Sequence, residues 1–377
     1  MHVKKQKLGL YIHIPFCLKK CNYCDFLSFS GCDFEEQTRY IKAVEEELKA
    51  YNLKESDYLV DTIFIGGGTP SLLSESLTEM LLESVYYYLL VDENAEISIE
   101  CNPKTLNDNK LNLYHQLGIN RLSIGCQSLD DSILKFMGRI HSCNDFLETF
   151  QKARSFDFDN INVDLIFGVP GQTSQKFHQD VEKILTLQPE HLSFYSLQIE
   201  EGTPFYEKYK KGEFNQVPDE EDRKMYHGTI EQLAKNGYVH YEISNAAKKG
   251  YECRHNLKYW SMADYLGVGL GAHSYIQGVR FNNTRNMQDY LSGNYVEASH
   301  KNTRKDSLSD YLFTGLRKIE GIDLSEFEKK FGQPIESLYG DMIHTFQEKG
   351  LLELSKSHLR FTKNGLDLSN AVLRELI

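Results

Sequence analysis

The stretch LYIHIPFCLKKCNYCDF, residues 10–26, contains the most informative pattern in this chain. A short apolar strand is followed by Cys17, Cys21 and Cys24, which have the spacing C-x3-C-x2-C. Iron–sulfur clusters are held by cysteine thiolates from short loops of this kind. A cubane cluster held by only three thiolates has one iron without a protein ligand, and such an iron is free to bind another molecule. The spacing therefore favours an iron–sulfur cluster with an open iron.

A zinc site or a disulfide framework could also account for a cysteine triplet. A structural zinc ion would take Cys32 or His13 as its fourth ligand, but zinc sites usually draw their four ligands from two separated pairs. A disulfide framework is typical of short secreted chains, whereas this chain has 377 residues and no signal peptide pattern. We expect the remaining cysteines to be scattered and reduced: Cys32, Cys101, Cys126, Cys143 and Cys253.

The length, hydropathy and net charge of the chain exclude several classes of protein. A length of 377 residues suits one large domain plus a smaller one. No apolar run approaches the length of a membrane span, and the basic N-terminus continues directly into a strand, so we expect a cytoplasmic protein without a membrane span. The net charge of -12 argues against a nucleic-acid binder, since such proteins neutralise phosphates with a basic face.

Strands and amphipathic helices alternate through the first two hundred residues. Alternation of this kind predicts an α/β fold with a parallel sheet, either an open doubly wound sheet or a partial barrel. Ligands bind at the carboxyl ends of the strands in both arrangements. The predicted strands cover residues 10–16, 61–67, 96–103, 121–128, 161–170 and 191–200.

Polar residues and glycines cluster at the ends of these strands. Cys17 follows the first strand, Gly66–Thr69 the second, Glu100 lies at the end of the third, Gln127 at the end of the fourth, and a GVPGQ sequence starts at Gly168. Turns between strands and helices are rich in glycine in any case, so each motif alone is weak. Because one of these strand ends holds the cysteine triplet, we expect them to form one active site.

The alternation stops near residue 200, and the rest of the chain has a different character. A helix is expected at about 219–236, and residues 237–300 look irregular, with many glycines and aromatics. Residues 301–377 predict helices, a hairpin and a final helix, which suits a winged-helix-like α+β module. This module has 12 basic and 12 acidic side chains. Such a balance favours a structural or substrate-covering role over DNA binding.

Two glycine motifs resemble nucleotide loops without matching them. GGGTPS, residues 66–71, follows a buried strand and lets backbone groups approach a ligand closely, but it lacks the Lys-Ser/Thr pair of a phosphate loop. GVGLG, residues 267–271, has the spacing G-x-G-x-G rather than G-x-G-x-x-G. A Rossmann cofactor site is therefore not expected.

Taken together, YIHIPFC, GGGTPS, DLIFGVPGQT and the C-terminal module resemble the radical SAM superfamily. Within it, they resemble the group that contains oxygen-independent coproporphyrinogen III oxidases and heme chaperones. The resemblance implies a radical-SAM partial (β/α)6 barrel over residues 1–236, a connecting region over 237–300 and an oxidase-type C-terminal domain over 301–377.

The resemblance also implies the cofactors and the residues that hold them. Cys17, Cys21 and Cys24 would hold a [4Fe–4S] cluster, and S-adenosyl-L-methionine would chelate its open iron. Without the family, Glu100 and Asp164 could equally be helix caps or solvated strand ends. The positions that match S-adenosylmethionine contacts are Tyr11, Tyr23, Gly67, Gly68, Thr69, Glu100, Gln127, Arg139 and Asp164.

Two departures separate this chain from the oxidases of the group. The oxidase pattern has a fourth cysteine two residues after the third, where this chain has Phe26. The oxidases also carry an N-terminal extension over the substrate, whereas this chain starts 16 residues before Cys17. We therefore expect a heme chaperone without coproporphyrinogen oxidase activity. The alternatives are the radical decarboxylation of coproporphyrinogen III and radical-driven heme degradation.

A downstream motif favours the chaperone. RHNLKYW, residues 254–260, resembles a heme-associated H-N-x-x-Y-W signature and makes His255, Tyr259 and Trp260 candidate heme contacts. A neutral imidazole can ligate heme iron, and aromatic rings can pack on the porphyrin. By spacing alone, a histidine held in a local turn and a core tryptophan account for the motif better. Cys253 is close by and could also be a ligand, and His273 is a weaker candidate.

The expected partners are heme and an acceptor protein that receives it. A respiratory complex is one candidate class of acceptor, and a homodimer is a candidate assembly of the chain.

Overall fold

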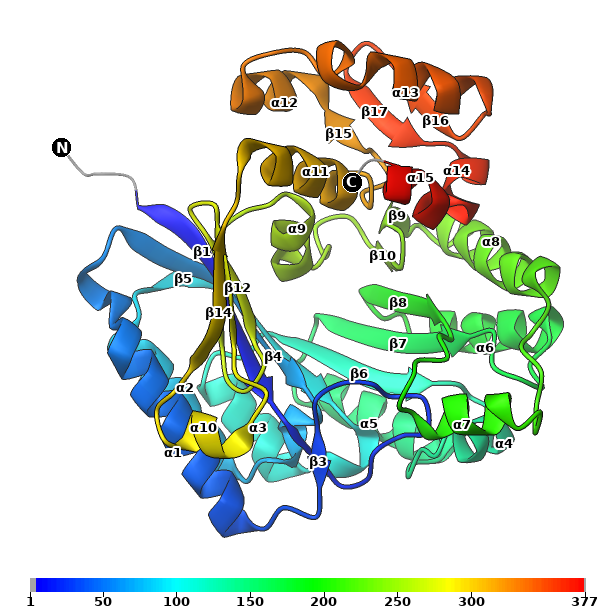
Figure 1. Ribbon diagram of the computed structural model, residues 1–377. Helices are drawn as coiled ribbons and strands as arrows, with labels where there is room; N and C mark the ends of the chain where they lie inside the picture. The colour runs from blue at the N-terminus through cyan, green and yellow to red at the C-terminus, as the bar shows by residue number, and fades with distance from the viewer. Residues whose placement is uncertain (1–4, 376–377) are drawn as a thin grey trace.

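Six parallel strands form the centre of the computed structural model, which describes residues 5–375 (Figure 1). They follow one another in the sheet in chain order, so each crossover is a local strand–helix–strand unit. All six strands predicted from the sequence are present, and the α/β fold class is confirmed. The strands are β1 (Gln6–Ile14), β4 (Tyr58–Gly67), β5 (Val91–Cys101), β6 (Arg121–Gln127), β7 (Ile161–Phe167) and β8 (His191–Ser196).

Helices cover the outer face of the curved sheet (Figure 1). Their starts are specified locally: Asp33 and Ser142 each form a capping box, in which side chain and backbone satisfy each other's hydrogen bonds at the helix start. The helices of this layer are α1 (Phe34–Tyr51), α2 (Glu75–Tyr88), α3 (Asp108–Gln116), α4 (Asp131–Phe136), α5 (Cys143–Ser155) and α6 (Ser174–Thr186). Short 3-10 turns occur at Leu53–Glu55, Pro70–Leu72 and Pro103–Thr105.

The hydrophobic core lies between the sheet and these helices. Leu10 and Ile12 of β1, for example, are fully buried, as are the Val44 and Leu48 side chains of α1. Strands that are buried on both faces give continuous apolar runs, which is why the sequence predicted them well.

The prediction that residues 237–300 are irregular is wrong, because they extend the same sheet at both edges. At one edge the strands pair antiparallel with β8, and at the other β11 runs parallel to β1. The strands have only three to six residues each and turn at glycines, so their pattern is too short to stand out in the sequence. They are β9 (Val239–Glu242), β10 (Asn245–Ala247), β11 (Tyr265–Val268), β12 (His273–Ile276), β13 (Val279–Asn283) and β14 (Val296–Lys301).

Buried Glu47 of α1 fastens this added edge to the helical layer. Its carboxylate accepts hydrogen bonds from the Gly269 backbone N–H at 2.9 Å, the Asn283 side-chain amide at 2.6 Å and the Tyr290 hydroxyl at 2.6 Å. The three donors lie before β12, at the end of β13 and in helix α10 (Met287–Leu291). One carboxylate therefore holds both ends of the β12–β13 hairpin in place.

The C-terminal residues form a smaller unit with its own apolar core. As predicted, helices lead into a hairpin and a final helical segment, and this unit lies above the sheet at the top of Figure 1. Two backbone hydrogen bonds connect this unit to the edge of the main sheet. The Ile243 N–H donates to the Arg317 carbonyl oxygen, and the Ile319 N–H donates to the Tyr241 carbonyl oxygen. Its elements are α11 (Arg304–Gly315), β15 (Ile322–Asp323), α12 (Leu324–Phe331), α13 (Glu336–Glu348), β16 (Leu352–Leu354), β17 (His358–Phe361), α14 (Lys363–Asp367) and α15 (Ser369–Glu375).

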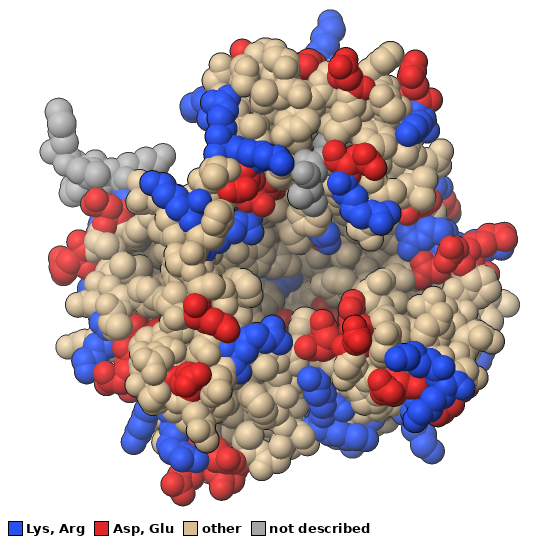
Figure 2. Space-filling model, viewed as in Figure 1, with Lys and Arg blue, Asp and Glu red and all other residues tan. Residues whose placement is uncertain are grey.

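On the face shown in Figure 2, acidic and basic side chains are intermixed, and this face is hollowed at its centre. This face therefore lacks the single basic stripe that phosphate binding needs. Within residues 5–375, no helix is both long enough and apolar enough to cross a membrane.

Candidate functional site

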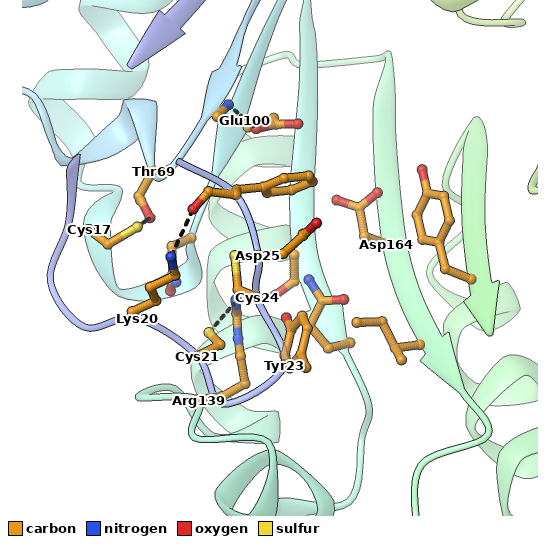
Figure 3. A pocket seen from close by; sticks show the side chains of 18 of the residues that line it. Cys17, Lys20, Cys21, Tyr23, Cys24, Asp25, Thr69, Glu100, Arg139 and Asp164 are labelled. Atoms are coloured by element: carbon orange, nitrogen blue, oxygen red, sulfur yellow. Dashed lines mark hydrogen bonds between the residues drawn. The ribbon is translucent and has the colours of Figure 1, made fainter. Parts of the chain in front are cut away.

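Cys17 ends β2 (Phe16–Cys17), and Cys21 and Cys24 lie on the loop from there to β3 (Phe29–Ser30). The three cysteines line one cavity of about 400 Å³, and Figure 3 shows them on the same side of it. The ends of β4 and β6 line the same cavity. The Thr69 hydroxyl donates to Cys17 Sγ at 3.6 Å, and the Arg139 guanidinium donates to Cys21 Sγ at 3.5 Å. Elements far apart in the sequence therefore orient the thiols toward a shared space.

This arrangement suits a cluster better than a single ion. Across the described part of the chain, no three His, Cys, Asp or Glu side chains are close enough together to hold one metal ion. A zinc ion needs such a close set, whereas a cubane cluster takes one thiolate on each of three separate irons. Burial raises the pKa of the Cys24 thiol to about 11, because the charged thiolate is disfavoured away from water. The residues present fit a [4Fe–4S] cluster.

The glycine motif forms a bare backbone cradle beside the cysteines. Gly67 has φ +115°, and a Cβ added there would lie 2.6 Å from the His13 ring. A Cβ on Gly68 would lie 2.7 Å from the Phe16 carbonyl oxygen and 3.0 Å from Cys17 Sγ. Only glycine fits at these two positions, because a side chain there would collide with protein atoms of β1 and β2, against which the end of β4 packs.

Two half-buried carboxyl groups, on β5 and β7, line the cavity. Glu100 Oε2 accepts a hydrogen bond from the Gly67 N–H at 2.9 Å, and burial, with the nearby Asp164 charge, raises the Glu100 pKa to about 8. Asp164 accepts from the Asn162 amide at 2.8 Å and the Ser123 hydroxyl at 3.0 Å, and burial raises its pKa as well. Neither residue caps a helix. Both are placed as hydrogen-bond acceptors for a polar ligand.

Gln127 and Arg139 complete this wall. Gln127 ends β6 in the left-handed region, with φ +65°, at a point where the pairing with β7 shifts register. Non-glycine residues in this backbone conformation cluster at active sites and ligand-binding sites, where the surrounding structure holds them in place. Arg139 also donates to the Gly125 carbonyl oxygen at 3.1 Å, which fixes the guanidinium beside the cysteine loop.

The cavity gathers most of the predicted site residues and several that were not predicted. Tyr23, Gly67, Gly68, Thr69, Glu100, Gln127, Arg139 and Asp164 all line it with the three cysteines. Ser123 and Tyr195 also line it, and the rule that ligands bind at the carboxyl ends of strands would have found Tyr195 at the end of β8. Lys20 donates to the Phe26 carbonyl oxygen at 2.9 Å and so closes the cysteine loop on itself.

Tyr11 lies elsewhere, in the lining of a second cavity of about 550 Å³. Its hydroxyl is 2.9 Å from His13 Nδ1, inside that lining. Asp25 and Phe26 line both cavities, so the segment directly after Cys24 forms the wall between them.

The predicted heme contacts divide between the second cavity and the protein interior. Tyr259 and Trp260 line the cavity, whereas His255 is fully buried and lines neither cavity. Both His255 ring nitrogens are engaged, with Thr62 Oγ1 at 2.9 Å and the Tyr259 hydroxyl at 2.8 Å. Burial, followed by the charge of Lys258, lowers the His255 pKa to about 3. As folded, this imidazole is a structural group rather than a free ligand.

Helix α9 (Arg254–Trp260), which carries this motif, is itself firmly anchored. Glu96 accepts from the backbone N–H groups of Arg254 at 3.0 Å and His255 at 3.1 Å. The thiol of buried Cys253 lies 3.7 Å from the same carboxylate, so it is not a free ligand either. His273 lines the second cavity.

Sequence models of two known protein families match separate parts of the chain. The sequence model of the radical SAM superfamily matches residues 11–184, and that of the HemN C-terminal domain matches residues 302–368. The first matched segment contains the cysteines and the glycine cradle.

Curated relatives cover nearly the whole chain. "Heme chaperone HemW" of Bacillus subtilis is 37% identical over 96% of this chain and 97% of its own length. The proteins of that name from Lactococcus lactis and Escherichia coli are 34% and 32% identical, over 97% and 98% of this chain and 96% and 98% of their own lengths.

Among solved structures, coproporphyrinogen III oxidase (HemN) from Escherichia coli, a radical SAM enzyme, superposes with a TM-score of 0.87. The likeness covers 99% of this chain and 91% of that one at 22% identity, and it therefore confirms the fold of a radical SAM barrel with its C-terminal domain. The sequence identity to the curated relatives, which extends over nearly the whole chain, distinguishes the HemW proteins from the oxidase of similar fold. The chain belongs to the HemW family of the radical SAM superfamily.

Proposed function

We propose that this chain is a heme chaperone, which binds a [4Fe–4S] cluster, S-adenosylmethionine and heme and hands the heme to an acceptor protein. The observation that carries the proposal is its end-to-end likeness, at 30–37% identity, to proteins named heme chaperone HemW. The oxidase of similar fold shares fewer residues, 22% of the aligned positions.

The first cavity supports the cofactor part of the proposal. Cys17, Cys21 and Cys24 would hold the cluster, and its open iron would bind the amino and carboxylate groups of S-adenosylmethionine. Gly67, Gly68 and Thr69 line the same cavity beside the cysteines, where the methionine end of the cofactor would lie. Glu100 and Asp164 offer carboxyl oxygens to ligand hydroxyl groups from β5 and β7.

Phe26 supports a chaperone over an oxidase. It occupies the position of the oxidases' fourth cysteine, and its side chain is 59% exposed while lining both cavities. Because the exposed ring lies in the lining of both cavities, it is accessible to a molecule bound in either one. A phenyl ring offers packing area to a flat apolar molecule, whereas a cysteine there would offer a reactive thiol.

The proposal includes a cytoplasmic location. The cysteines at all eight positions in the sequence are free of disulfides, which suits a reducing compartment.

An anaerobic assay on the reconstituted protein tests this function. We expect hemin to bind saturably and coproporphyrinogen III to be recovered unchanged in the presence of S-adenosylmethionine and a reductant. Absorbance titration measures the first, and chromatography of the extracted porphyrins measures the second. Formation of protoporphyrinogen IX would show that the chain is an oxidase, and an unsaturable hemin titration would contradict the chaperone function.

A further inference from the structure

The second cavity has the features of a ligand-binding site, although the cluster and S-adenosylmethionine are assigned to the first cavity. It lies against the cysteine loop, and its lining combines aromatic rings with two arginines and two histidines. The volume of about 550 Å³ is within the range typical of small-molecule sites. We propose that heme binds in this cavity, with His273 as the iron ligand and Arg285 beside the propionates. This inference rests on the proposed function, since it assigns the heme of that function to a place.

The histidines decide which group can reach the iron. A heme-ligating imidazole needs a ring nitrogen that is not already hydrogen-bonded. His13 has none, because its Nδ1 contacts the Tyr11 hydroxyl at 2.9 Å and its Nε2 contacts the Leu27 carbonyl oxygen at 2.8 Å. His255 has none either, because Thr62 and Tyr259 occupy both nitrogens.

His273 differs from both. It begins β12, lines the cavity and is exposed, and no residue in the range 5–375 forms a hydrogen bond with its ring. It is therefore the one histidine of the lining whose nitrogens are available to an incoming iron.

The two arginines supply positive charge for a dianionic ligand. Arg280 is held by Asp310, with a contact of 2.5 Å, and lies over the Tyr275 ring at 5.6 Å. Arg285 forms no ion pair or hydrogen bond with any described residue, so its full charge and all its donors are available. A guanidinium binds carboxylates in a fixed two-donor geometry, which suits a propionate.

The aromatic side chains that line the second cavity suit the flat apolar porphyrin ring of heme. Tyr259, Trp260 and Tyr265 come from or follow α9, and Phe26 reaches the cavity from the cysteine loop. The Arg317 guanidinium lies over the Trp260 ring at 4.5 Å and holds this ring in the lining. The HNxxYW motif then contributes its aromatic residues to the site, while its histidine supports α9 from inside.

Hemin titrations of the reconstituted full-length protein test the assignment. We expect His273→Ala to raise the Kd for hemin at least about tenfold and to abolish the absorbance signature of histidine-ligated heme. Arg285→Gln should raise the Kd by about threefold to tenfold. Exposed His344 and Arg39 lie outside both cavities, so His344→Ala and Arg39→Gln are matched controls that should bind as the wild type does.

Metal-free protoporphyrin IX separates ligation from packing. It has the propionates and the ring but no iron, so Arg285→Gln should weaken its binding while His273→Ala leaves it unchanged. Wild-type hemin affinity in both His273→Ala and Arg285→Gln would overturn the assignment, and so would loss of the ligation signature in His255→Ala alone with an unchanged unfolding temperature. If the wild-type protein itself fails to bind hemin, the proposed function fails instead.

Discussion

A Cys21→Ser variant is expected to purify and reconstitute without a stable cluster, with its iron content falling from about four ions per chain to below about one. Serine keeps the size of the side chain but does not provide a thiolate at neutral pH. Cys21 suits this test because its Sγ accepts a hydrogen bond from Arg139, whose position in the lining does not depend on the cysteine loop alone. The loss should therefore be nearly complete while the fold is kept.

Iron and sulfide analysis and the visible absorbance of the anaerobic protein measure this effect. Cys143→Ser is the matched control, because Cys143 is a partly buried cysteine at the start of α5, away from both cavities. We expect it to keep its full iron content. A Cys21→Ser protein that retains four irons would mean that the triplet does not hold the cluster.

An Asp61→Ala variant is expected to lose about 3 to 5 kcal/mol of stability. Asp61 is 4% exposed in β4 and pairs with Lys258 of α9 at 2.6 Å, and Lys258 is 9% exposed. Arg254 Nη2 also lies 3.8 Å from the carboxylate. Removing Asp61 leaves a buried ammonium without a counter-charge, and this costs more than the pair contributes when both partners are present.

Urea unfolding followed by fluorescence and circular dichroism measures the loss. Exposed Asp57, just before the same strand, provides the control, because Asp57→Ala should change stability by less than about 0.5 kcal/mol. The double variant Asp61→Leu with Lys258→Met should recover most of the loss, since apolar residues of similar volume can replace a buried pair. An Asp61→Ala protein as stable as the wild type would show that α9 is not anchored by this pair.

The central fold was predictable because its signals are local and strong. Buried parallel strands such as residues 161–167 give continuous apolar runs, and capping residues such as Asp33 mark the helix starts. The residues at the ends of these strands then had to meet at one edge of the sheet. That is why Glu100, Gln127 and Asp164 line the same cavity as the cysteines.

The edges of the sheet were not predictable in the same way. Strand β10 has three residues, and whether it pairs with β8 depends on tertiary contacts rather than on its own pattern. The carboxylate that holds the β12–β13 hairpin comes from Glu47, more than two hundred positions away in the sequence. A contact between residues so far apart cannot be predicted from a local sequence pattern.

The histidines show the limit of motif reasoning most clearly. His255 lies in a motif that predicts a heme contact, yet its neighbours Thr62 and Tyr259 occupy both ring nitrogens. His273 was the weaker candidate, because nothing around it in the sequence suggests a site. Whether a ring nitrogen is free depends on the groups that the fold brings next to it, so this distinction required the structure.

Heme transfer tests the central claim most directly. The reconstituted protein, loaded with hemin and freed of excess by gel filtration, is mixed anaerobically with an excess of a heme-free globin, and the absorbance of the heme-loaded globin is followed. A chaperone should release intact heme, so the account predicts that the globin acquires nearly all of it. Heme that stays bound to the chain, or disappears as ring-opened product, would contradict the account.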